Sequence, residues 1–568
     1  MTAWRERAFS AVLACVLGLT VPACIIQIGT DRLPAIGPLS ATAIMVIAAL
    51  VVAAIAFPCA LFVLRRGPGI VERTARHNPL PWLPLTLDAR SIAICTGIIF
   101  LFWIPCLVLQ YPAAANTDAM SQIYQFQTPA PTLYSGGYVD AEFVDHHPVF
   151  DTLLYGSFVW VGDALFGSQN AGLFLLALVQ SAFTAWMLAL SCCYLERLAV
   201  PKVFRLVTLA FFALVPLFGF YAATMLKDST FSAIYVLWTV LYLEAFRTRG
   251  KALGSWRRTA LFALATLLCF VTKKTGVYVL VPGMLVMLVA YRGYWKQLAV
   301  CIAAPLLVFQ GLVPAVLYPA IGGVAPGGNE EVFGTLYQQV ITVVRESDDL
   351  TADERSAVDA VLDVDAAVEA YRPTITDQVK DQRRLGTQAS DYAEFLKAYL
   401  SIGLRHPGEY TWTICRLNGS FLAPGKAITY YHTCEFPEAN TRGFAQAKNA
   451  DNWHYTWYKP EPIKTWAKQV DTVYTDAVST NPLLAFLLGR GLYTGWIPII
   501  CCLLACARDK RYAIVFVPVA LSLAVLIIGP TSSARYALPL FYTAPLMLGT
   551  LCHALSSGSH SPDSQLPK

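Results

Sequence analysis

The sequence predicts an all-α polytopic membrane protein with about 12 transmembrane helices, because of its composition and its long apolar runs. Of its 568 residues, 56% are hydrophobic and only 14% are charged, whereas a soluble protein carries roughly 25% charged residues. Apolar runs of roughly 18 or more residues recur along the chain, and each is long enough to cross a bilayer core about 30 Å thick. Lipid is therefore the expected solvent for most of the chain.

The predicted spans follow these runs in order. The first comes after Arg5 and Arg7 with no small-residue cleavage site behind it, so we expect an uncleaved helix rather than a signal peptide. The spans cover residues 8–29, 38–64, 91–110, 170–192, 203–223, 229–246, 259–272, 277–291, 298–318, 487–506, 513–529 and 537–554.

The distribution of charge predicts how these spans are oriented. The loops assigned to the cytoplasm are rich in Lys and Arg, whereas residues 112–169, assigned outside, contain six Asp or Glu and no Lys or Arg. An excess of basic residues marks the cytoplasmic loops of a membrane protein. We therefore predict a multi-pass protein of the cell (plasma) membrane, with both termini in the cytoplasm and its unusual polar residues on the extracytoplasmic side.

Two long outer segments separate the chain into units. The predicted units are residues 1–90, an N-terminal two-helix extension with a cytoplasmic loop; 91–318, a transmembrane core whose first outer loop is 112–169; 319–486, a mainly helical extracytoplasmic segment between the ninth and tenth spans; 487–556, three C-terminal spans; and 557–568, a cytoplasmic tail.

The large outer segment carries its own local signals. Thr351 and Glu354 have the spacing of a capping box, so a helix is expected to start at Thr351. A second helix is expected over residues 390–404. Cys415 and Cys434 are the two cysteines outside the predicted spans, and because an outer compartment is oxidising we predict that they form a disulfide.

Basic residues on the predicted outer face need an explanation, since they oppose the charge bias that orients the protein. Such residues raise the cost of membrane insertion when they lie near a span. An anion held at the outer leaflet would compensate for that cost, and snorkelling of single side chains to lipid headgroups is the alternative. Outside the large segment these residues are Arg32, Lys227, Lys273, Lys274, Arg490 and Arg535.

Acidic residues and histidines of the first outer loop supply groups for chemistry. Asp118 and Asp145 have no basic residue nearby in sequence, and either carboxylate could act as a general base. The structural alternatives are a helix N-cap for Asp118 and a turn before Pro148 for Asp145. The adjacent pair His146 and His147 has poor spacing for metal ligands, so no metal site is predicted.

These elements, in this order and on one predicted side of the membrane, resemble the GT-C superfamily, and within it an uncharacterised bacterial branch. Members of the superfamily are polytopic glycosyltransferases that use polyprenyl-phosphate-linked sugars as donors. The elements that carry the resemblance are Asp118-Ala119-Met120-Ser121-Gln122, His146-His147-Pro148, Lys227-Asp228, Lys273-Lys274-Thr275-Gly276 and Arg535-Tyr536.

The resemblance covers residues 91–320 and 487–555, and two features depart from the family pattern. Two spans precede the helix that leads into the long first loop, whereas relatives place that loop after their first helix. Lys273 and Lys274 stand where relatives often carry Arg-Asn, which keeps positive charge but loses the guanidinium fork.

The resemblance implies an inverting transfer of sugar to an acceptor hydroxyl, with Asp118 as the general base. Asp145 would be the substitute base, and Arg490, which matches no element of the family, is predicted as a further phosphate contact. The remaining roles implied are phosphate binding by Lys227, Lys273, Lys274 and Arg535, hydrogen bonds from His146 and His147 to that phosphate, orientation of sugar or acceptor by Gln122, and positioning of Lys227 by Asp228.

The implied partners are membrane lipid, the polyprenyl-phosphate-linked sugar, and a glycan, lipid or protein acceptor. No cofactor is expected to be required, and a role for a divalent cation is left open. Basic residues are dispersed, so no nucleic-acid partner is expected. A lipid-linked saccharide transporter or flippase, and an outward-facing polysaccharide polymerase or ligase, are the alternative functions. Transporters commonly place charges near the bilayer midplane and show repeat symmetry, whereas polymerases and ligases usually depend on Arg and His without an essential Asp in the first loop.

Overall fold

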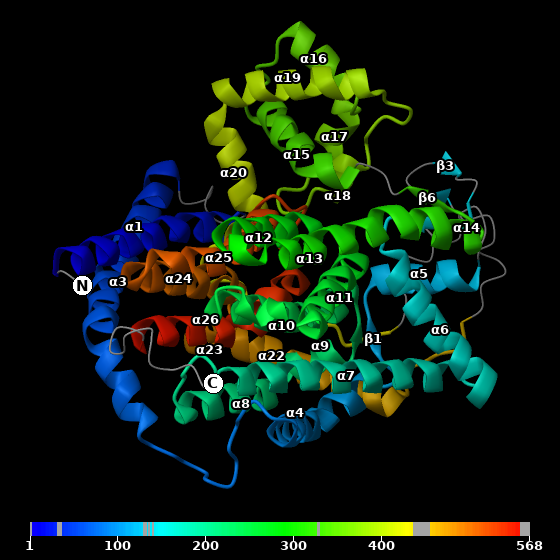
Figure 1. The fold of residues 1–568 in the computed structure, drawn as a ribbon. Helices are drawn as coiled ribbons and strands as arrows, with labels where there is room; N and C mark the ends of the chain where they lie inside the picture. Colours follow the sequence, from blue (N-terminus) through cyan, green and yellow to red (C-terminus); the bar gives the residue numbers. More distant parts are fainter. Residues whose placement is uncertain are drawn as a thin grey trace.

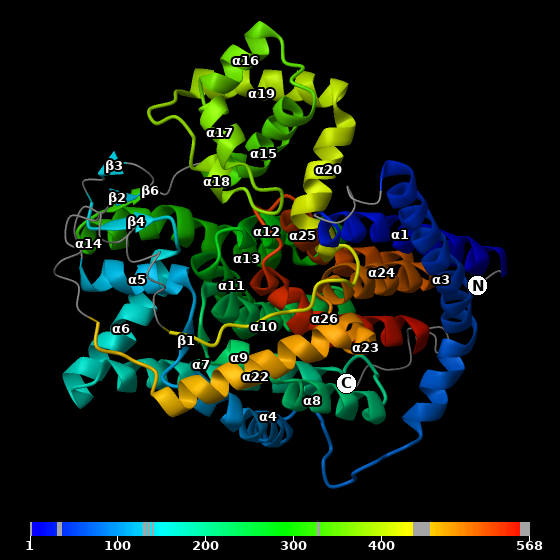
Figure 2. The same ribbon diagram turned by 180° about the vertical axis from the view of Figure 1, so that it is seen from behind.

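The computed structural model describes residues 3–30, 37–128, 133–134, 137–138, 141–326, 330–434 and 455–556. These residues form an almost entirely helical protein, in which a bundle of long helices carries a smaller helical unit on one side (Figures 1 and 2). Arg32 lies outside the described residues.

Nine helices in the described part of the chain are long and apolar enough to cross a membrane, and a tenth is the α8–α9 pair if its 56° bend lies within one span. The chain is therefore an all-α, multi-pass membrane protein. These helices are α1 (Ala3–Ile28), α3 (Pro38–Ala75), α4 (Ala89–Gln110), α6 (Val149–Phe166), α7 (Gln169–Tyr194), α8 (Lys202–Leu214), α9 (Pro216–Ala222), α10 (Lys227–Arg247), the continuous run Arg292–Ala320, Lys510–Ile527 and Ala534–Ser556.

The three C-terminal members of this set contain more than one helix type. The first comprises η2 (Arg292–Tyr294), α13 (Trp295–Leu307), the π-helix η3 (Val308–Leu317) and α14 (Tyr318–Ala320); the second η7 (Lys510–Tyr512) and α25 (Ala513–Ile527); the third η8 (Ala534–Ala537) and α26 (Leu538–Ser556).

Two differences separate these helices from the predicted spans. Three predicted spans fall on helices of 17 residues or fewer, which at 1.5 Å per residue are at most about 26 Å long: α11 (Trp256–Thr272), α12 (Gly276–Ala290) and the run Leu492–Arg508, formed by the π-helix η6 (Leu492–Trp496) and α24 (Ile497–Arg508). Conversely, α6 lies inside the predicted first outer loop yet has the length and apolar character of a span, because an apolar run follows Pro148.

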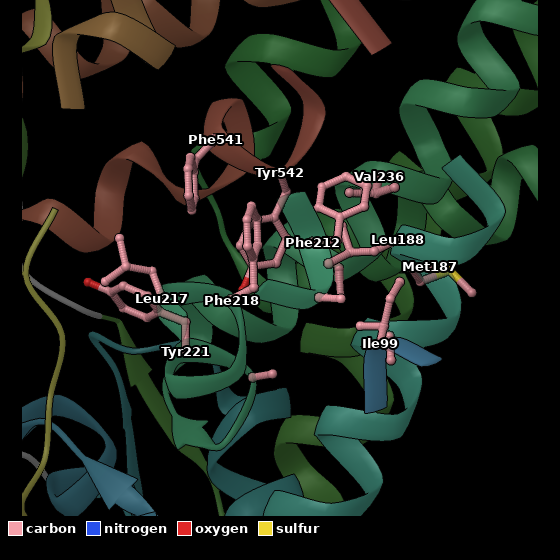
Figure 3. Close-up of a cluster of buried hydrophobic side chains, with 14 of the residues drawn as sticks. Ile99, Met187, Leu188, Phe212, Leu217, Phe218, Tyr221, Val236, Phe541 and Tyr542 are labelled. Carbon is pink, nitrogen blue, oxygen red and sulfur yellow. The ribbon is translucent and has the colours of Figure 1, made fainter. Parts of the chain in front are cut away.

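The bundle core lies where α4, α7, α8, α9, α10 and α26 meet (Figure 3). Phe218 of α9 and Phe541 of α26 stack with ring centroids 4.4 Å apart, and both are fully buried. The indole of Trp103 in α4 donates a hydrogen bond to the carbonyl of Phe212. Large aromatic side chains therefore fix the first, middle and last parts of the chain against one another.

Short strands occur only in pairs in the part of the chain that is described. β1 (Ala114–Ala115) pairs in parallel with β5 (Thr224–Met225), and β4 (Phe143–Asp145) pairs in parallel with β6 (Val324–Pro326). The third pair is antiparallel and joins β2 (Leu133–Tyr134) to β3 (Gly137–Tyr138). The helix α5 (Thr117–Gln127) directly follows β1.

The helical unit beside the bundle has its own core, which includes Val340, Val361 and Phe395. The capping box predicted at Thr351 and Glu354 is confirmed, and the helix predicted over residues 390–404 is confirmed as α19. The unit comprises α15 (Glu330–Glu346), α16 (Ala352–Asp359), α17 (Val364–Ala370), α18 (Asp377–Lys380), α19 (Ala389–Arg405), α20 (Pro407–Asn418) and η4 (Gly419–Phe421).

Residues 455–487 return the chain to the bundle through α22 (Glu461–Thr480) and α23 (Pro482–Leu487), and the short η1 (Lys251–Gly254) joins α10 to α11. The predicted Cys415–Cys434 disulfide is wrong. Cys415 packs beside Trp412 and Ile26, whereas Cys434 packs in another cluster beside Trp457, and no bond joins the two sulfurs.

Candidate functional site

A parallel strand pair brings two helix N-termini together. β1 leads into α5 and β5 leads into α10, and Ala115 pairs with Met225. Asp118 is therefore held in the first turn of α5 beside Lys227 and Asp228, which open α10. We name the Asp118 cluster for the group that gathers here: Asp118, His147, Lys227, Asp228, Lys273 and Arg535.

Asp118 forms the centre of this cluster. Its Oδ2 accepts a hydrogen bond from Nη1 of Arg535 at 2.8 Å and lies 3.5 Å from Nζ of Lys227. The N-cap alternative is wrong, because the side chain of Asn116 caps α5 and accepts from the amide of Ala119 at 3.0 Å. The carboxylate of Asp118 is thus directed at cations, and 21% of its side-chain surface is exposed.

The charges around Asp118 decide its protonation. Burial on its own would raise the pKa of Asp118, but the positive charges of Arg535 and Lys227 outweigh burial and hold the pKa well below its ordinary value of 3.8. Asp118 is therefore ionised at neutral pH, and in this state it is a weak base.

His147 joins the cluster through Lys227. Its Nδ1 lies 2.9 Å from Nζ of Lys227. Burial, reinforced by the ammonium of Lys227, holds the pKa of His147 well below its ordinary value of 6.5. The imidazole is therefore neutral at pH 7, so Nδ1 accepts from Lys227 and Nε2 carries the proton. The ring of His146 packs edge-on against that of His147, with centroids 4.5 Å apart.

Asp228 has no exposed surface and contacts two cations. Its Oδ1 accepts a hydrogen bond from Nζ of Lys273, and its Oδ2 lies 3.8 Å from Nε of Arg535. The ammonium of Lys273 also lies over the rings of Phe231 and Tyr536, at 5.5 and 5.2 Å from their centroids. The predicted partnership of Asp228 with Lys227 is thus replaced by one with Lys273 and Arg535.

Lys274 and Asp145 form a neighbouring ion pair outside the cluster. Their charged atoms are 2.9 Å apart, and Lys274 also donates to the backbone carbonyl of Asp145. Because β4 pairs with β6, Asp145 is fixed where the first long loop meets residues 324–326. Of the two adjacent lysines, Lys273 therefore points into the Asp118 cluster, whereas Lys274 contacts Asp145 in the first long loop.

Arg490 does not reach the cluster. It is 6% exposed, and its guanidinium donates to backbone carbonyls of Lys426, Ala427 and Ser532. Ser532 lies three residues before Arg535, so Arg490 holds the segment that carries Arg535. This supporting role replaces the predicted contact with phosphate.

The helix that Gln122 contacts carries a buried carboxylate, Asp151, that was not predicted from the sequence. The amide of Gln122 donates to the carbonyl of Pro148 and to Thr152, each at 3.2 Å. Asp151, one residue before Thr152, has no exposed surface, and neither of its oxygens has a hydrogen-bond partner among the described residues. An acidic residue inside an apolar helical run, four positions after His147, was the available signal.

The described residues contain no group of three or more His, Cys, Asp or Glu arranged to hold a metal ion. The cluster can instead bind an anion through Arg535 and Lys227, with one ionised carboxylate next to that anion. A partly exposed carboxylate between two cations is an arrangement that can accept a proton beside a bound phosphate.

The helices and this cluster define the class of the protein. It is a multi-pass, all-α membrane protein in which acidic and basic side chains, the Asp118 cluster, gather at the N-termini of α5 and α10. The chain belongs to a family of unknown function, DUF6020, whose family model matches residues 41–564. The matched region includes every member of the Asp118 cluster. No curated protein and no solved structure matches the chain.

Proposed function

We propose that this protein is an inverting GT-C-type glycosyltransferase, which moves a sugar from a polyprenyl-phosphate donor to an acceptor hydroxyl with Asp118 as the general base. The observation that carries the proposal is the contact of one carboxylate oxygen of Asp118 with both Arg535, at 2.8 Å, and Lys227, at 3.5 Å. A proton acceptor thus contacts two cations that can bind phosphate.

The proposed step is a single displacement at the anomeric carbon of the donor sugar. The acceptor O–H bond breaks, its proton passes to a carboxylate oxygen of Asp118, and the acceptor oxygen bonds to the anomeric carbon. The bond from that carbon to the phosphate oxygen breaks, and polyprenyl phosphate leaves with the electron pair. Attack from the face opposite the phosphate inverts the anomeric configuration. Arg535 and Lys227 stabilise the charge that develops on the leaving phosphate.

Donor binding would also strengthen the base. In the empty cluster Arg535 and Lys227 hold the pKa of Asp118 low. A phosphate that takes these two cations as its own partners neutralises them, so the pKa of Asp118 rises and the carboxylate accepts a proton more readily. Neutral His147, bonded to Lys227 through Nδ1, keeps an N–H on Nε2 that can donate to the phosphate.

The topology that fits this function has twelve spans, with the short helices α11, α12 and η6–α24 completing the set and α6 outside it. Both termini would then be cytoplasmic, and the Asp118 cluster and residues 319–486 extracytoplasmic in the plasma membrane. The support is the charge of residues 112–169, which include six acidic residues and no Lys or Arg.

The test is Asp118→Asn in the full-length protein in nanodiscs, assayed with a panel of polyprenyl-phosphate-linked hexoses and pentoses and a membrane extract as acceptor. Loss of a general base lowers the rate by about 10² to 10⁴-fold. Polyprenyl phosphate should bind at least as tightly, because Arg535 and Lys227 lose the carboxylate that competes with it.

The matched control is Asp163→Asn. Asp163 lies 12 residues further along α6 than Asp151, accepts from Gln169 at 2.9 Å, and should leave transfer unchanged. Full transfer by Asp118→Asn would overturn the proposal. Movement of intact lipid-linked saccharide across the bilayer, without a new glycosidic bond, would instead identify a flippase.

A further inference from the structure

A cavity of about 380 Å³ lies at the opposite ends of α4 and α7 from the Asp118 cluster. It is lined by residues 75–84, which precede α4, and by residues 196–205, which follow α7. The Asp118 cluster lies beyond the other ends of both helices, and α4 alone is about 33 Å long. Figures 1 and 2 agree in placing the segment before α4 far from α5.

Two basic side chains line this cavity. Lys202 is 8% exposed, and its ammonium donates to Oδ1 of Asn78 at 2.7 Å and to the carbonyl of Leu80 at 2.9 Å. Arg205 donates through Nη1 to the carbonyl of Leu85 at 2.6 Å. Neither cation is paired with a carboxylate in the described residues, and Nε of Arg205 is buried without an acceptor. Glu196 interacts electrostatically with Arg205, so the protein offsets at most one of the two positive charges.

The one carboxylate among the residues that line the cavity, Glu196, also bonds the backbone. Oε2 of Glu196 accepts from the amide of Leu87 at 2.9 Å. Glu196 thus fixes the loop before α4, and the cavity keeps a net positive lining. A net positive lining favours an anion, and basic pockets between helices on one membrane side suit phosphate headgroups.

The loops around the cavity are held in costly backbone conformations. Leu80, Leu85 and Ala199 have positive φ angles of 49°, 53° and 55° although none is glycine. Such residues persist where surrounding contacts over-determine them, and they cluster at binding sites. Here Lys202 donates a hydrogen bond to the carbonyl of Leu80, and Arg205 donates one to the carbonyl of Leu85. The two cations that line the cavity therefore also fix the backbone of the loop beside it.

The surroundings of the cavity select a lipid as the source of the anion. Trp82 is 69% exposed and Leu80 is 45% exposed in the same loop. The apolar helix α4 begins at Ala89, directly after this loop. Exposed tryptophan next to the end of an apolar helix marks the level of the headgroups.

We propose that this cavity binds the phosphate headgroup of an anionic phospholipid, in the leaflet opposite the Asp118 cluster. Lys202 and Arg205 hold the phosphate, and Trp82 contacts the glycerol and acyl chains. This site is separate from the proposed sugar transfer and does not depend on it.

The experiment measures binding of dioctanoyl phosphatidylglycerol, dioctanoyl phosphatidylcholine and inorganic phosphate to the full-length protein in detergent micelles, by thermal stabilisation and by native mass spectrometry. Wild type should bind the phosphatidylglycerol in preference to both other probes. The double variant Lys202→Gln/Arg205→Gln should bind it about tenfold more weakly or worse. Arg197→Gln, an exposed arginine that does not line the cavity, is the control with equal charge change and should bind normally.

A second variant keeps the test decisive if the double variant fails to fold. Glu196→Gln retains an oxygen that can accept from Leu87 but removes the only negative charge in the lining, so phosphatidylglycerol should bind several-fold more tightly. An unchanged affinity in Glu196→Gln would overturn the proposal, as would an equal loss in Arg197→Gln. If inorganic phosphate binds as tightly as phosphatidylglycerol, the anion that the cavity binds is free phosphate and not a lipid headgroup.

Discussion

Nη1 of Arg535 donates a hydrogen bond of 2.8 Å to Oδ2 of Asp118 across 417 residues of sequence. The same guanidinium donates through Nη2 to the hydroxyl of Tyr536 at 3.2 Å and directs Nε at Asp228, 3.8 Å away. Arg490 donates a hydrogen bond to the backbone carbonyl of Ser532, three residues before Arg535. One planar side chain therefore joins α5, the start of α10 and the start of the last span.

Arg535→Lys should show whether the function of Arg535 depends on the geometry of its guanidinium or on its positive charge alone. Lysine retains the positive charge but cannot donate in three fixed directions at once. We expect polyprenyl phosphate to bind about tenfold more weakly in Arg535→Lys, and sugar transfer to be lost in Arg535→Gln. The measurement is binding of polyprenyl phosphate to each variant in nanodiscs. Equal binding by the lysine variant and wild type would show that the fork geometry is not used.

His147 should be replaceable by a residue that keeps its acceptor. Because the imidazole is neutral and accepts from Lys227 through Nδ1, the amide oxygen of His147→Asn can take over that bond, whereas His147→Phe cannot. A hydrogen bond to a charged group contributes about 1.5–3 kcal/mol, so transfer should fall about 10 to 100-fold further in the phenylalanine variant than in the asparagine variant. Steady-state rates of the two variants, compared at equal expression, decide this.

Lys273→Met should destabilise the protein strongly. It leaves the fully buried Asp228 with Arg535, at 3.8 Å, as its remaining cation. Breaking a buried pair by removing one partner costs about 3–5 kcal/mol. The double variant Lys273→Met/Asp228→Asn should recover much of that loss, because no carboxylate is then left unpaired. The measurement is the free energy of unfolding from denaturant titration in micelles.

An exposed pair provides the control for this experiment. Lys397 and Glu394 are 2.6 Å apart, but their side chains are 72% and 61% exposed. Lys397→Met should change the free energy of unfolding by less than about 1 kcal/mol. A loss in Lys273→Met no larger than in Lys397→Met would mean that the buried pair contributes little.

The residues of the Asp118 cluster could be found from sequence, but their pairing could not. Asp118, Lys227 and Arg535 stand out because charge is rare near spans. The two-residue strands β1 and β5, which set the register of Asp118 against Lys227, have no sequence signal of their own. Arg490 was assigned to a ligand because nothing in its neighbours reveals that three backbone carbonyls converge on it.

The spans show a similar limit. Composition and apolar runs predicted an all-α membrane protein, because the bilayer imposes one length and one polarity on every span. The apolar run over α6 was assigned to a loop because the short acidic stretch before it reads as surface. Asp151 was missed for the same reason, and Cys415 and Cys434 were paired only because both lie outside the predicted spans.

Lowering the pH should destabilise the helical unit by protonating Glu354. Hydrogen bonds from Arg405 and from the amide of Thr351 lower the pKa of Glu354 from 4.5 to about 2. A carboxyl group whose pKa is lowered on folding contributes stability above its ordinary pKa and loses it as the pH falls toward the folded value. Hydrogen exchange in α16 and α19, corrected for intrinsic rates, should therefore accelerate between pH 4.5 and pH 2.

Arg405→Gln should remove that pH dependence, since it raises the pKa of Glu354 back toward its ordinary value. Exchange in α16 and α19 would then be faster already at pH 6 and change little down to pH 2. Arg384→Gln is the control, because its partner Asp359 is 46% exposed and Arg384 is 45% exposed. The same acceleration in Arg384→Gln as in Arg405→Gln would assign the effect to general charge loss.

The pH dependence of sugar transfer should differ between the empty and the donor-bound enzyme. Arg535 and Lys227 hold the pKa of Asp118 low, and we expect a bound donor phosphate to neutralise them. The acid limb of kcat/KM for the donor, which reports the free enzyme, should then lie at lower pH than the acid limb of kcat, which reports the complex. Initial rates from pH 4 to pH 8 at limiting and saturating donor should then show an acid limb in kcat and none in kcat/KM, because the pKa of Asp118 in the free enzyme lies below this range. In Arg535→Lys the difference should narrow, because a weaker contact to Asp118 leaves less for the phosphate to relieve. Acid limbs at the same pH in the kcat and kcat/KM profiles of wild type would show that the phosphate and Asp118 do not share these cations.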